Sequence, residues 1–127
     1  MTVRLKRAYE PPARGDVRRI LIDRLWPRGC PRNSLRIDAW PGELAPSDAF
    51  RRWFAHDPRR WQELRRRHQT ELRVPEIREL LQRIAARARR RPVTLVYAAT
   101  DKDRNNVVVM AGVLERLVRF IRAGKSA

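Results

Sequence analysis

Four side chains that together could form an anion-binding pocket follow a short apolar run near the start of the chain. Ile20–Ile22 is the apolar run, and Asp23, Arg24, Trp26 and Arg28 come directly after it. Arginine is the planar, bidentate partner of phosphate and carboxylate groups, so the two arginines would clamp an anion. The aspartate would orient them or bind a ribose hydroxyl, and the indole would stack on a base or a guanidinium. In the alternative interpretation the aspartate pairs with an arginine of a neighbouring strand, and the tryptophan closes the end of the sheet.

A second polar group follows the apolar run Val93–Ala98. Asp101, Asn105 and Asn106 lie where this run gives way to a helical pattern. A helix N-terminus offers unpaired backbone N–H groups and a dipole that favours anions. The alternative is that Asp101 or Asp103 caps the helix and does nothing more. Neither GxGxxG nor Walker A, the glycine-rich sequences that cradle phosphates, accompanies this turn.

Two further residues, Lys6 and Tyr97, occupy or end neighbouring strands in this interpretation. Ligands bind outside the carboxyl ends of the strands in open α/β sheets, so both side chains could converge on the same crevice. Each of them alone is more often a structural residue. The sequence thus predicts a pocket at the carboxyl edge of the sheet for an anionic small molecule, either phosphorylated or nucleotide-like.

The remaining reactive side chains predict neither a metal site nor a cofactor. Cys30 is the single cysteine, and the two histidines, His56 and His68, lack the spacing of a zinc site. His68 falls on the apolar face of a helix and is expected to pack at the edge of the core, whereas Ser47 is expected to cap a helix. The catalytic residues are therefore unknown, and the sequence leaves open whether any reaction is catalysed.

The elements that must position these residues follow from apolar periodicity and from proline. We expect strands at Thr2–Tyr9, Val17–Leu25 and Val93–Ala98, and helices at 47–54, 57–72, 75–91 and 105–122. Strands that are apolar on both faces are typical of a parallel sheet buried between two layers. The predicted fold class is α/β, a small three-layer domain with a mainly parallel sheet over residues 1–122, followed by a frayed tail at 123–127.

The net charge and the hydropathy of the chain limit the classes of partner that it can have. The chain has 30 lysines and arginines against 14 acidic residues, and its formal net charge of +16 would attract polyanions. Arginines make up 27 of the 30, a skew that GC-rich codon usage also produces. The alternative function is a sequence-nonspecific nucleic-acid-binding protein that uses its arginine-rich faces. No apolar run reaches the roughly 18 residues of a membrane span and no secretory signal is recognised, so we expect a cytoplasmic protein.

Several segments together resemble a known bacterial family. DRLWPRG at Asp23–Gly29 is the most specific of them, and KRAYEPP at 6–12, APS at 45–47, WFAHDPRRWQEL at 53–64 and LVYAATDKDRNNVVVMAGVL at 95–114 accompany it. They are similar to the YeaO-like branch of the domain of unknown function 488 (DUF488) family. The resemblance covers about residues 3–118 and implies a compact cytoplasmic α/β domain of flavodoxin-like or Rossmann-like character, with no established activity.

The chain departs from that branch at one position that matters for chemistry. The branch usually carries Asn-His-Ala where this chain has Asn105-Asn106-Val107, and often a lysine where Thr100 stands. Position 106 therefore lacks an imidazole that could serve as acid, base or ligand.

Overall fold

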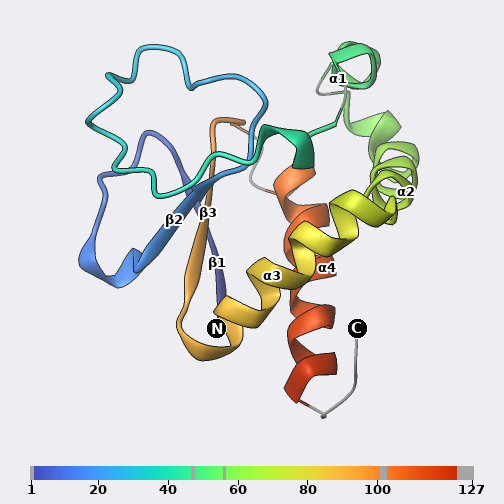
Figure 1. The fold of residues 1–127 in the computed structure, drawn as a ribbon. Helices are drawn as coiled ribbons and strands as arrows, with labels where there is room; N and C mark the ends of the chain where they lie inside the picture. Colours follow the sequence, from blue (N-terminus) through green and yellow to red (C-terminus); the bar gives the residue numbers. More distant parts are fainter. Residues whose placement is uncertain (1, 47, 56, 101–102, 123–127) are drawn as a thin grey trace.

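The computed structural model describes residues 2–46, 48–55, 57–100 and 103–122, and a three-stranded parallel sheet lies at its centre (Figure 1). The strands are β1 (Val3–Arg7), β2 (Arg18–Leu21) and β3 (Val93–Tyr97), in the order β1-β3-β2. In the middle strand, Val93 lies opposite Val3 on one side and Arg18 on the other. The predicted α/β fold with a parallel sheet is confirmed, and the carboxyl ends of β2 and β3 meet at one edge.

Strand β2 is shorter than its apolar pattern predicts, because it ends at Leu21 rather than Leu25. Ile22 still donates its backbone N–H to the carbonyl of Val96 at 3.2 Å, and the chain then turns away from the sheet. The outer edge of β2 pairs with a later segment, since the N–H of Leu21 donates to the carbonyl of Ala39 at 2.9 Å. This edge of the sheet is therefore covered by the chain itself.

In the described residues, four α-helices and three short 3-10 turns accompany the sheet. The helices are α1 (Asp48–Phe54), α2 (Trp61–Glu71), α3 (Pro75–Arg90) and α4 (Asn106–Arg122), and the 3-10 turns are η1 (Arg14–Asp16), η2 (Gly42–Leu44) and η3 (Pro58–Arg60). Proline sets two boundaries, because Pro75 begins α3 and Pro92 follows its last turn. Asp57 accepts a hydrogen bond from the N–H of Arg59 at 3.0 Å, as a cap should, but the turn it begins is η3 rather than the first turn of α2. Ser47, the expected cap of α1, lies outside the described residues.

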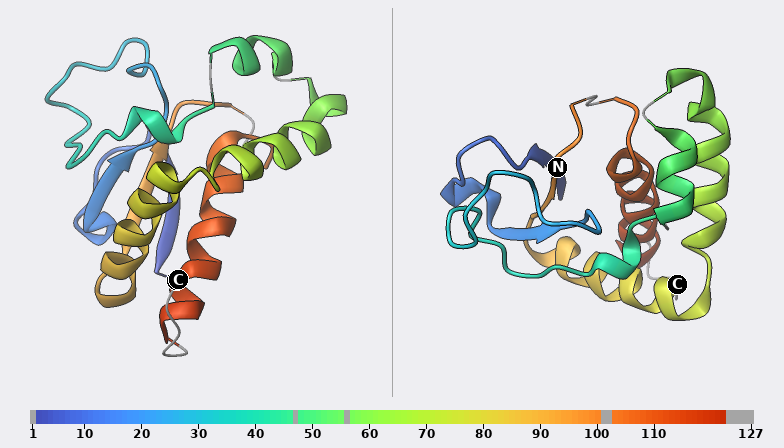
Figure 2. Two further views of the ribbon diagram at one scale, coloured as in Figure 1. Left: turned by 45° about the vertical axis from the view of Figure 1, so that its right-hand side comes forward. Right: turned by 90° about the horizontal axis from the view of Figure 1, so that it is seen from above.

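Helices α3 and α4 cover one face of the sheet, and α2 packs against α4 (Figures 1 and 2). Ile20, Val93 and Leu95 belong to the core between the sheet and these helices. Leu81 and Leu114 enter the same core from α3 and α4, at the apolar positions that their periodicity predicts. Within the described ranges, no helix combines the length and the apolar character needed to cross a bilayer.

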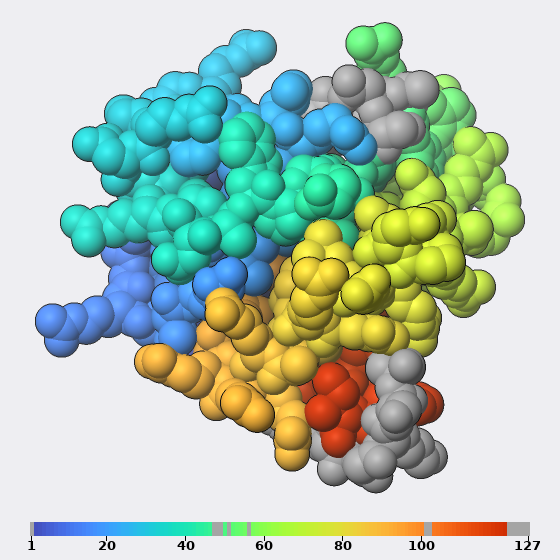
Figure 3. Space-filling view, viewed as in Figure 1, coloured from blue at the N-terminus to red at the C-terminus, as the bar shows by residue number. Residues whose placement is uncertain are grey.

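The opposite face of the sheet is covered by residues 22–46, which form much of the surface above β2 in the space-filling view (Figure 3). Leu35 from this segment packs on Leu21 and Val96 in a second, smaller core. Prolines at 27, 31, 41 and 46 prevent the segment from forming a long helix. The three layers expected from the sequence are present, and the third is an irregular segment rather than a helical layer.

Candidate ligand-binding cavity

A cavity of about 360 Å³ opens at the carboxyl edge of the sheet, beside the ends of β2 and β3 and the start of α4. Its polar lining includes Asp23, Trp26, Arg28, Asn105 and Asn106. Members of both polar groups identified in the sequence therefore line one cavity. This follows from the parallel pairing of β2 with β3, which brings the residues after each strand to the same edge.

Asp23 ties the ends of the two strands together. Its Oδ2 accepts a hydrogen bond from the backbone N–H of Ala98 at 2.8 Å, and its backbone carbonyl accepts one from Nε1 of Trp40 at 2.6 Å. A hydrogen bond to a carboxylate is stronger than one between neutral groups. The half-buried aspartate thus fixes the wall of the cavity as well as lining it.

The two arginines after β2 have different surroundings. Arg24 donates from Nε to the carbonyl of Pro46 and from Nη2 to the carbonyl of Ala45, both at 3.2 Å, and it does not line the cavity. Arg28 does line the cavity and is exposed, and its guanidinium has no hydrogen bond or ion pair with a described residue. The backbone carbonyl of Arg28 accepts a hydrogen bond from Oη of Tyr9 at 3.1 Å. Of the two expected anion clamps, only Arg28 is therefore free to meet a ligand in the cavity.

The indole of Trp26 is held in a fixed orientation at the cavity wall. Its Nε1 donates to the carbonyl of Cys30 at 2.7 Å, across a turn in which Gly29 has the positive φ of 80° that glycine tolerates. Its ring meets that of Trp40 edge to face, with centroids 5.5 Å apart. The guanidinium of Arg32 lies 4.7 Å from the centroid of Trp26 and 5.5 Å from that of Trp40, a cation–π arrangement with both rings.

The side chain of Asn105, the residue before α4, accepts hydrogen bonds from backbone N–H groups in the first turn of the helix. Oδ1 of Asn105, a residue only 2% exposed, accepts hydrogen bonds from the N–H groups of Val107 at 2.8 Å and Val108 at 3.1 Å. These are two of the donors that a bound anion would otherwise take at a helix N-terminus. Asn106 is half-buried and remains in the cavity wall. Asp101, expected to cap the helix or to bind a ligand, lies outside the described residues.

Lys6 and Tyr97 do not line this cavity. Nζ of Lys6 is 3.2 Å from both carboxylate oxygens of Asp16, which also accepts from Nη1 of Arg19 at 2.6 Å, on the sheet face covered by residues 22–46. Burial acts to raise the pKa of Asp16, but hydrogen bonds from Ala13, Lys6 and Arg19 outweigh it and hold the pKa below its usual value. Tyr97 is 3% exposed and belongs to the main core.

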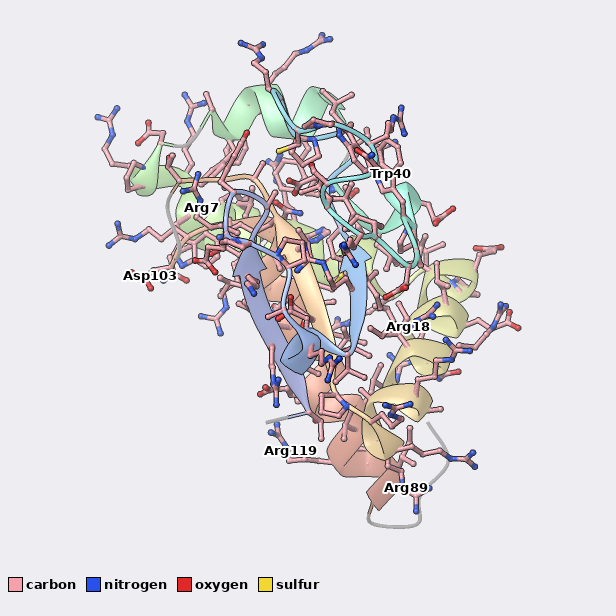
Figure 4. The ribbon with its side chains drawn as sticks, turned by 90° about the vertical axis from the view of Figure 1, so that its left-hand side faces the viewer. Arg7, Arg18, Trp40, Arg89, Asp103 and Arg119 are labelled. Atoms are coloured by element: carbon pink, nitrogen blue, oxygen red, sulfur yellow. The ribbon has the colours of Figure 1, made fainter. Side chains whose placement is uncertain are left out.

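Two residues that the sequence analysis did not single out, Arg7 and Tyr9, complete the rim at the end of β1. Arg7 lies at the carboxyl end of this strand (Figure 4) and donates from Nε to the carbonyl of Ala99 at 3.0 Å and from Nη2 to that of Ala98 at 3.2 Å. Its guanidinium also lies 5.1 Å from the ring centroid of Tyr9, which lines the cavity. The sequence pattern could have indicated both residues, because a strand at 2–9 parallel to the other strands brings the residues at its carboxyl end to the same edge of the sheet.

The described lining of the cavity offers groups that can recognise a ligand. Its described lining supplies a guanidinium, a carboxylate, two amides and the rings of Trp26 and Tyr9, with neither histidine nor cysteine among them. Within the described part of the chain, no group of three or more His, Cys, Asp or Glu residues is arranged to hold a metal ion. The arrangement can bind and orient a ligand that carries an anionic group and a flat ring.

The chain is similar along most of its length to proteins from several bacteria. Residues 2–125 match the model of a family named DUF488-N3i and described as "Inactive DUF488-N3 subclade". "Uncharacterized protein YeaO" of Escherichia coli (strain K12) is 35% identical over 117 residues, which is 92% of this chain and 100% of that protein. "Uncharacterized protein Rv3073c" of Mycobacterium tuberculosis (strain ATCC 25618 / H37Rv) is 34% identical over 112 residues, 88% of this chain and 92% of that protein. No solved structure matches the chain.

Proposed function

Because this chain belongs to the DUF488-N3i family, the inactive DUF488-N3 subclade, we propose that it binds a small anionic ligand without transforming it. The ligand is phosphorylated or nucleotide-like, and its site is the cavity at the carboxyl edge of the sheet. Membership confirms the resemblance to YeaO-like DUF488 proteins that the DRLWPRG segment indicates. The word "inactive" in the family description agrees with a lining in which Asn106 stands where the branch usually has histidine.

The exposed guanidinium of Arg28 is the observation that carries this proposal. Among the described residues of the cavity lining it is the one cationic side chain, and no described residue neutralises it. The neighbouring cations, Arg7 and Arg24, are already bonded to backbone carbonyls. A guanidinium left unpaired beside a cavity is suited to bidentate contact with a phosphate or carboxylate.

The aromatic rings beside Arg28 favour a ligand with a planar part. Trp26 is fixed by its bond to Cys30, and Tyr9 by its bond to the carbonyl of Arg28, so neither ring needs to be ordered when a ligand arrives. A volume of about 360 Å³ also lies within the roughly 300–1,000 Å³ of small-molecule sites. A mononucleotide combines the anion and the ring that this lining fits, and the amide of Asn106 is placed to select among bases or sugars.

Thermal melting with adenosine monophosphate tests the proposal. We expect the nucleotide to stabilise the wild-type protein by about 2.7 kcal/mol at a hundredfold excess over its dissociation constant. Adenosine, which lacks the phosphate, should stabilise it much less. The Arg28→Gln variant should melt as the free wild type does and should lose the shift produced by adenosine monophosphate.

The matched control is Arg119→Gln on α4. Arg119 is also exposed and free of hydrogen bonds with described residues, and it lies toward the far end of the molecule from Arg7 (Figure 4). Its neutralisation removes the same charge and should leave the nucleotide shift intact at matched ionic strength. Equal shifts in wild type and Arg28→Gln, or equal losses in both variants, would show that the cavity is not an anion site.

A further inference from the structure

A second concave surface runs along the outer edge of β2, from Arg18 and Val93 at the starts of β2 and β3 to Trp40, which adjoins the ligand cavity. Two adjoining hollows of about 610 Å³ and 430 Å³ lie beside β2 and α3 and share Arg18, Arg87 and Val93 in their walls. We name this surface the arginine groove and define it by seven residues: Arg14, Arg18, Trp40, Arg83, Arg87, Arg90 and Arg91. Figure 3 looks onto this face, where residues 14–19 and the end of α3 lie side by side at the lower left.

The cations of the arginine groove come from two distant parts of the sequence. Arg14 and Arg18 approach from η1 and β2, whereas Arg87 and Arg90 belong to the last turn of α3. Cations at the end of a helix are favoured by its dipole, which accounts for part of the α3 cluster. The dipole gives no reason for arginines on the facing β2 side of the same hollow.

Most of these guanidiniums are not neutralised by any described residue. Arg14, Arg18, Arg87, Arg90 and Arg91 make no side-chain hydrogen bond or ion pair with a described residue. In the larger hollow the one acidic residue of the described lining is Asp38. Its Oδ2 accepts a hydrogen bond from the backbone N–H of Arg19 at 2.8 Å, and this bond holds the carboxylate against the edge of β2. Arg83 does have a partner, because its Nη2 donates to Glu79 at 3.3 Å.

Trp40 adds an aromatic platform to the smaller hollow. Its Nε1 is anchored on the carbonyl of Asp23 at 2.6 Å, yet 38% of the residue is exposed and it lines the same hollow as Arg18 and Arg83. Figure 4 shows Trp40 and Arg18 on the same side of the sheet. A basic track combined with an anchored aromatic ring is the usual construction of a surface that binds single-stranded nucleic acid, because bases stack on the ring while the backbone follows the cations.

We propose that the arginine groove binds single-stranded nucleic acid, with guanidiniums on successive phosphates and Trp40 stacked on a base. Along α3 the rise from Arg83 to Arg90 is about 10 Å, enough to span more than one phosphate of a strand. This location gives a physical site to the alternative function that the overall charge of +16 suggests. An acidic peptide would use the guanidiniums but would offer no base to stack on the exposed part of the Trp40 ring.

The first experiment measures the salt dependence of binding to a fluorescent single-stranded 12-nucleotide probe of mixed sequence, by anisotropy at 50–200 mM NaCl. The test variant carries Arg18→Gln and Arg87→Gln, and the control carries Arg65→Gln and Arg119→Gln, two exposed arginines outside the arginine groove. Each lost phosphate contact should reduce the log–log salt slope by about 0.7, so the test variant should lose about 1.4. We expect at least a tenfold weakening at 50 mM NaCl for the test variant and less than threefold for the control.

The second experiment isolates stacking with a probe of the same length that lacks bases. Wild type should bind the abasic strand at least about fivefold more weakly than the normal strand, a difference that Trp40→Leu abolishes and Trp40→Phe largely keeps. Melting curves of each variant report whether the fold is retained, and Trp40→Phe carries the test if Trp40→Leu does not fold.

Three results would overturn the proposal. They are equal weakening of the test and control pairs, equal binding of normal and abasic strands by wild type, and tighter binding of a duplex or of polyglutamate than of the single strand. Arg18 and Arg87 do not line the ligand cavity, so the salt-dependence experiment is independent of the nucleotide test there, whereas Trp40 contacts Trp26 of that cavity and its variants report on the stacking step alone.

Discussion

His68 should make the stability of this protein fall in mild acid. The side chain is 1% exposed on α2, and neither of its ring nitrogens has a hydrogen-bond partner in the described structure. Burial lowers the pKa of His68 from 6.5 to about 4, because the charged imidazolium would lose its hydration. The unfolded chain therefore binds a proton more readily than the folded one between these two values. The part of the free energy of unfolding that depends on a neutral His68 is fully present above pH 6.5. It is lost progressively as the pH falls toward 4.

The magnitude follows from the two pKa values. The full loss corresponds to about 3 kcal/mol, and between pH 7.5 and pH 5.0 the linkage relation gives about 2 kcal/mol. Glu71, whose Oε1 lies 4.0 Å from Nδ1 of His68, acts in the opposite sense. Burial raises the pKa of Glu71, against the influence of the Arg24 charge, so folding favours its protonated form. A comparison with a variant that lacks the imidazole therefore separates the effect of His68 on stability from that of Glu71.

Urea denaturation followed by circular dichroism at pH 7.5 and 5.0 measures the effect. His68→Leu keeps most of the volume and removes two buried polar atoms that lack partners, so its free energy of unfolding at pH 7.5 should equal or exceed that of the wild type. The variant should lose about 2 kcal/mol less than the wild type on moving to pH 5.0. The reasoning is refuted if His68→Leu and wild type lose the same stability over this range.

Substitutions at two further positions test the hydrogen bonds that support the sheet, by urea denaturation at neutral pH. Asp23→Ala removes the acceptor of the Ala98 N–H and should lower the free energy of unfolding by about 1.5–3 kcal/mol, whereas Asp23→Asn, which keeps an oxygen, should cost less; similar values for the two would mean that the Ala98 bond is not the reason. Asp16→Asn leaves the buried Arg19 and its neighbour Lys6 without their counter-charge and should cost about 3 kcal/mol or more, so a loss below 1 kcal/mol would contradict a structural role for this network.

The sequence predicts the frame of the cavity well, because the frame depends on backbone patterns. The apolar runs ending at Ile22 and Ala98 predict two buried parallel strands, and their pairing brings Asp23, Arg28 and Asn106 to one cavity. The ligand assigned to this cavity remains a prediction.

Side-chain directions were harder to foresee. On β1 polar and apolar residues are mixed on both sides, so the pattern does not show that Lys6 points to the sheet face of Asp16 while Arg7 turns to the carbonyls of Ala98 and Ala99. The bonds of Arg24 depend on Ala45 and Pro46, about twenty residues away in an irregular segment without periodicity. Such partners follow from the path of a loop, which propensity does not specify.

The position of β1 at the rim of the sheet bears on how the protein behaves at high concentration. Its outer side pairs with no described strand, and such an open edge is a template for another chain. Arg4 is exposed there and Lys6 is half-buried, and prolines 11 and 12 follow shortly after the strand. A second copy laid along this edge would bring like charges together. Lys6 is paired with Asp16, so the exposed charge of Arg4 is the one that opposes pairing between two copies at this edge, and this protection weakens as a rising ionic strength screens the charge.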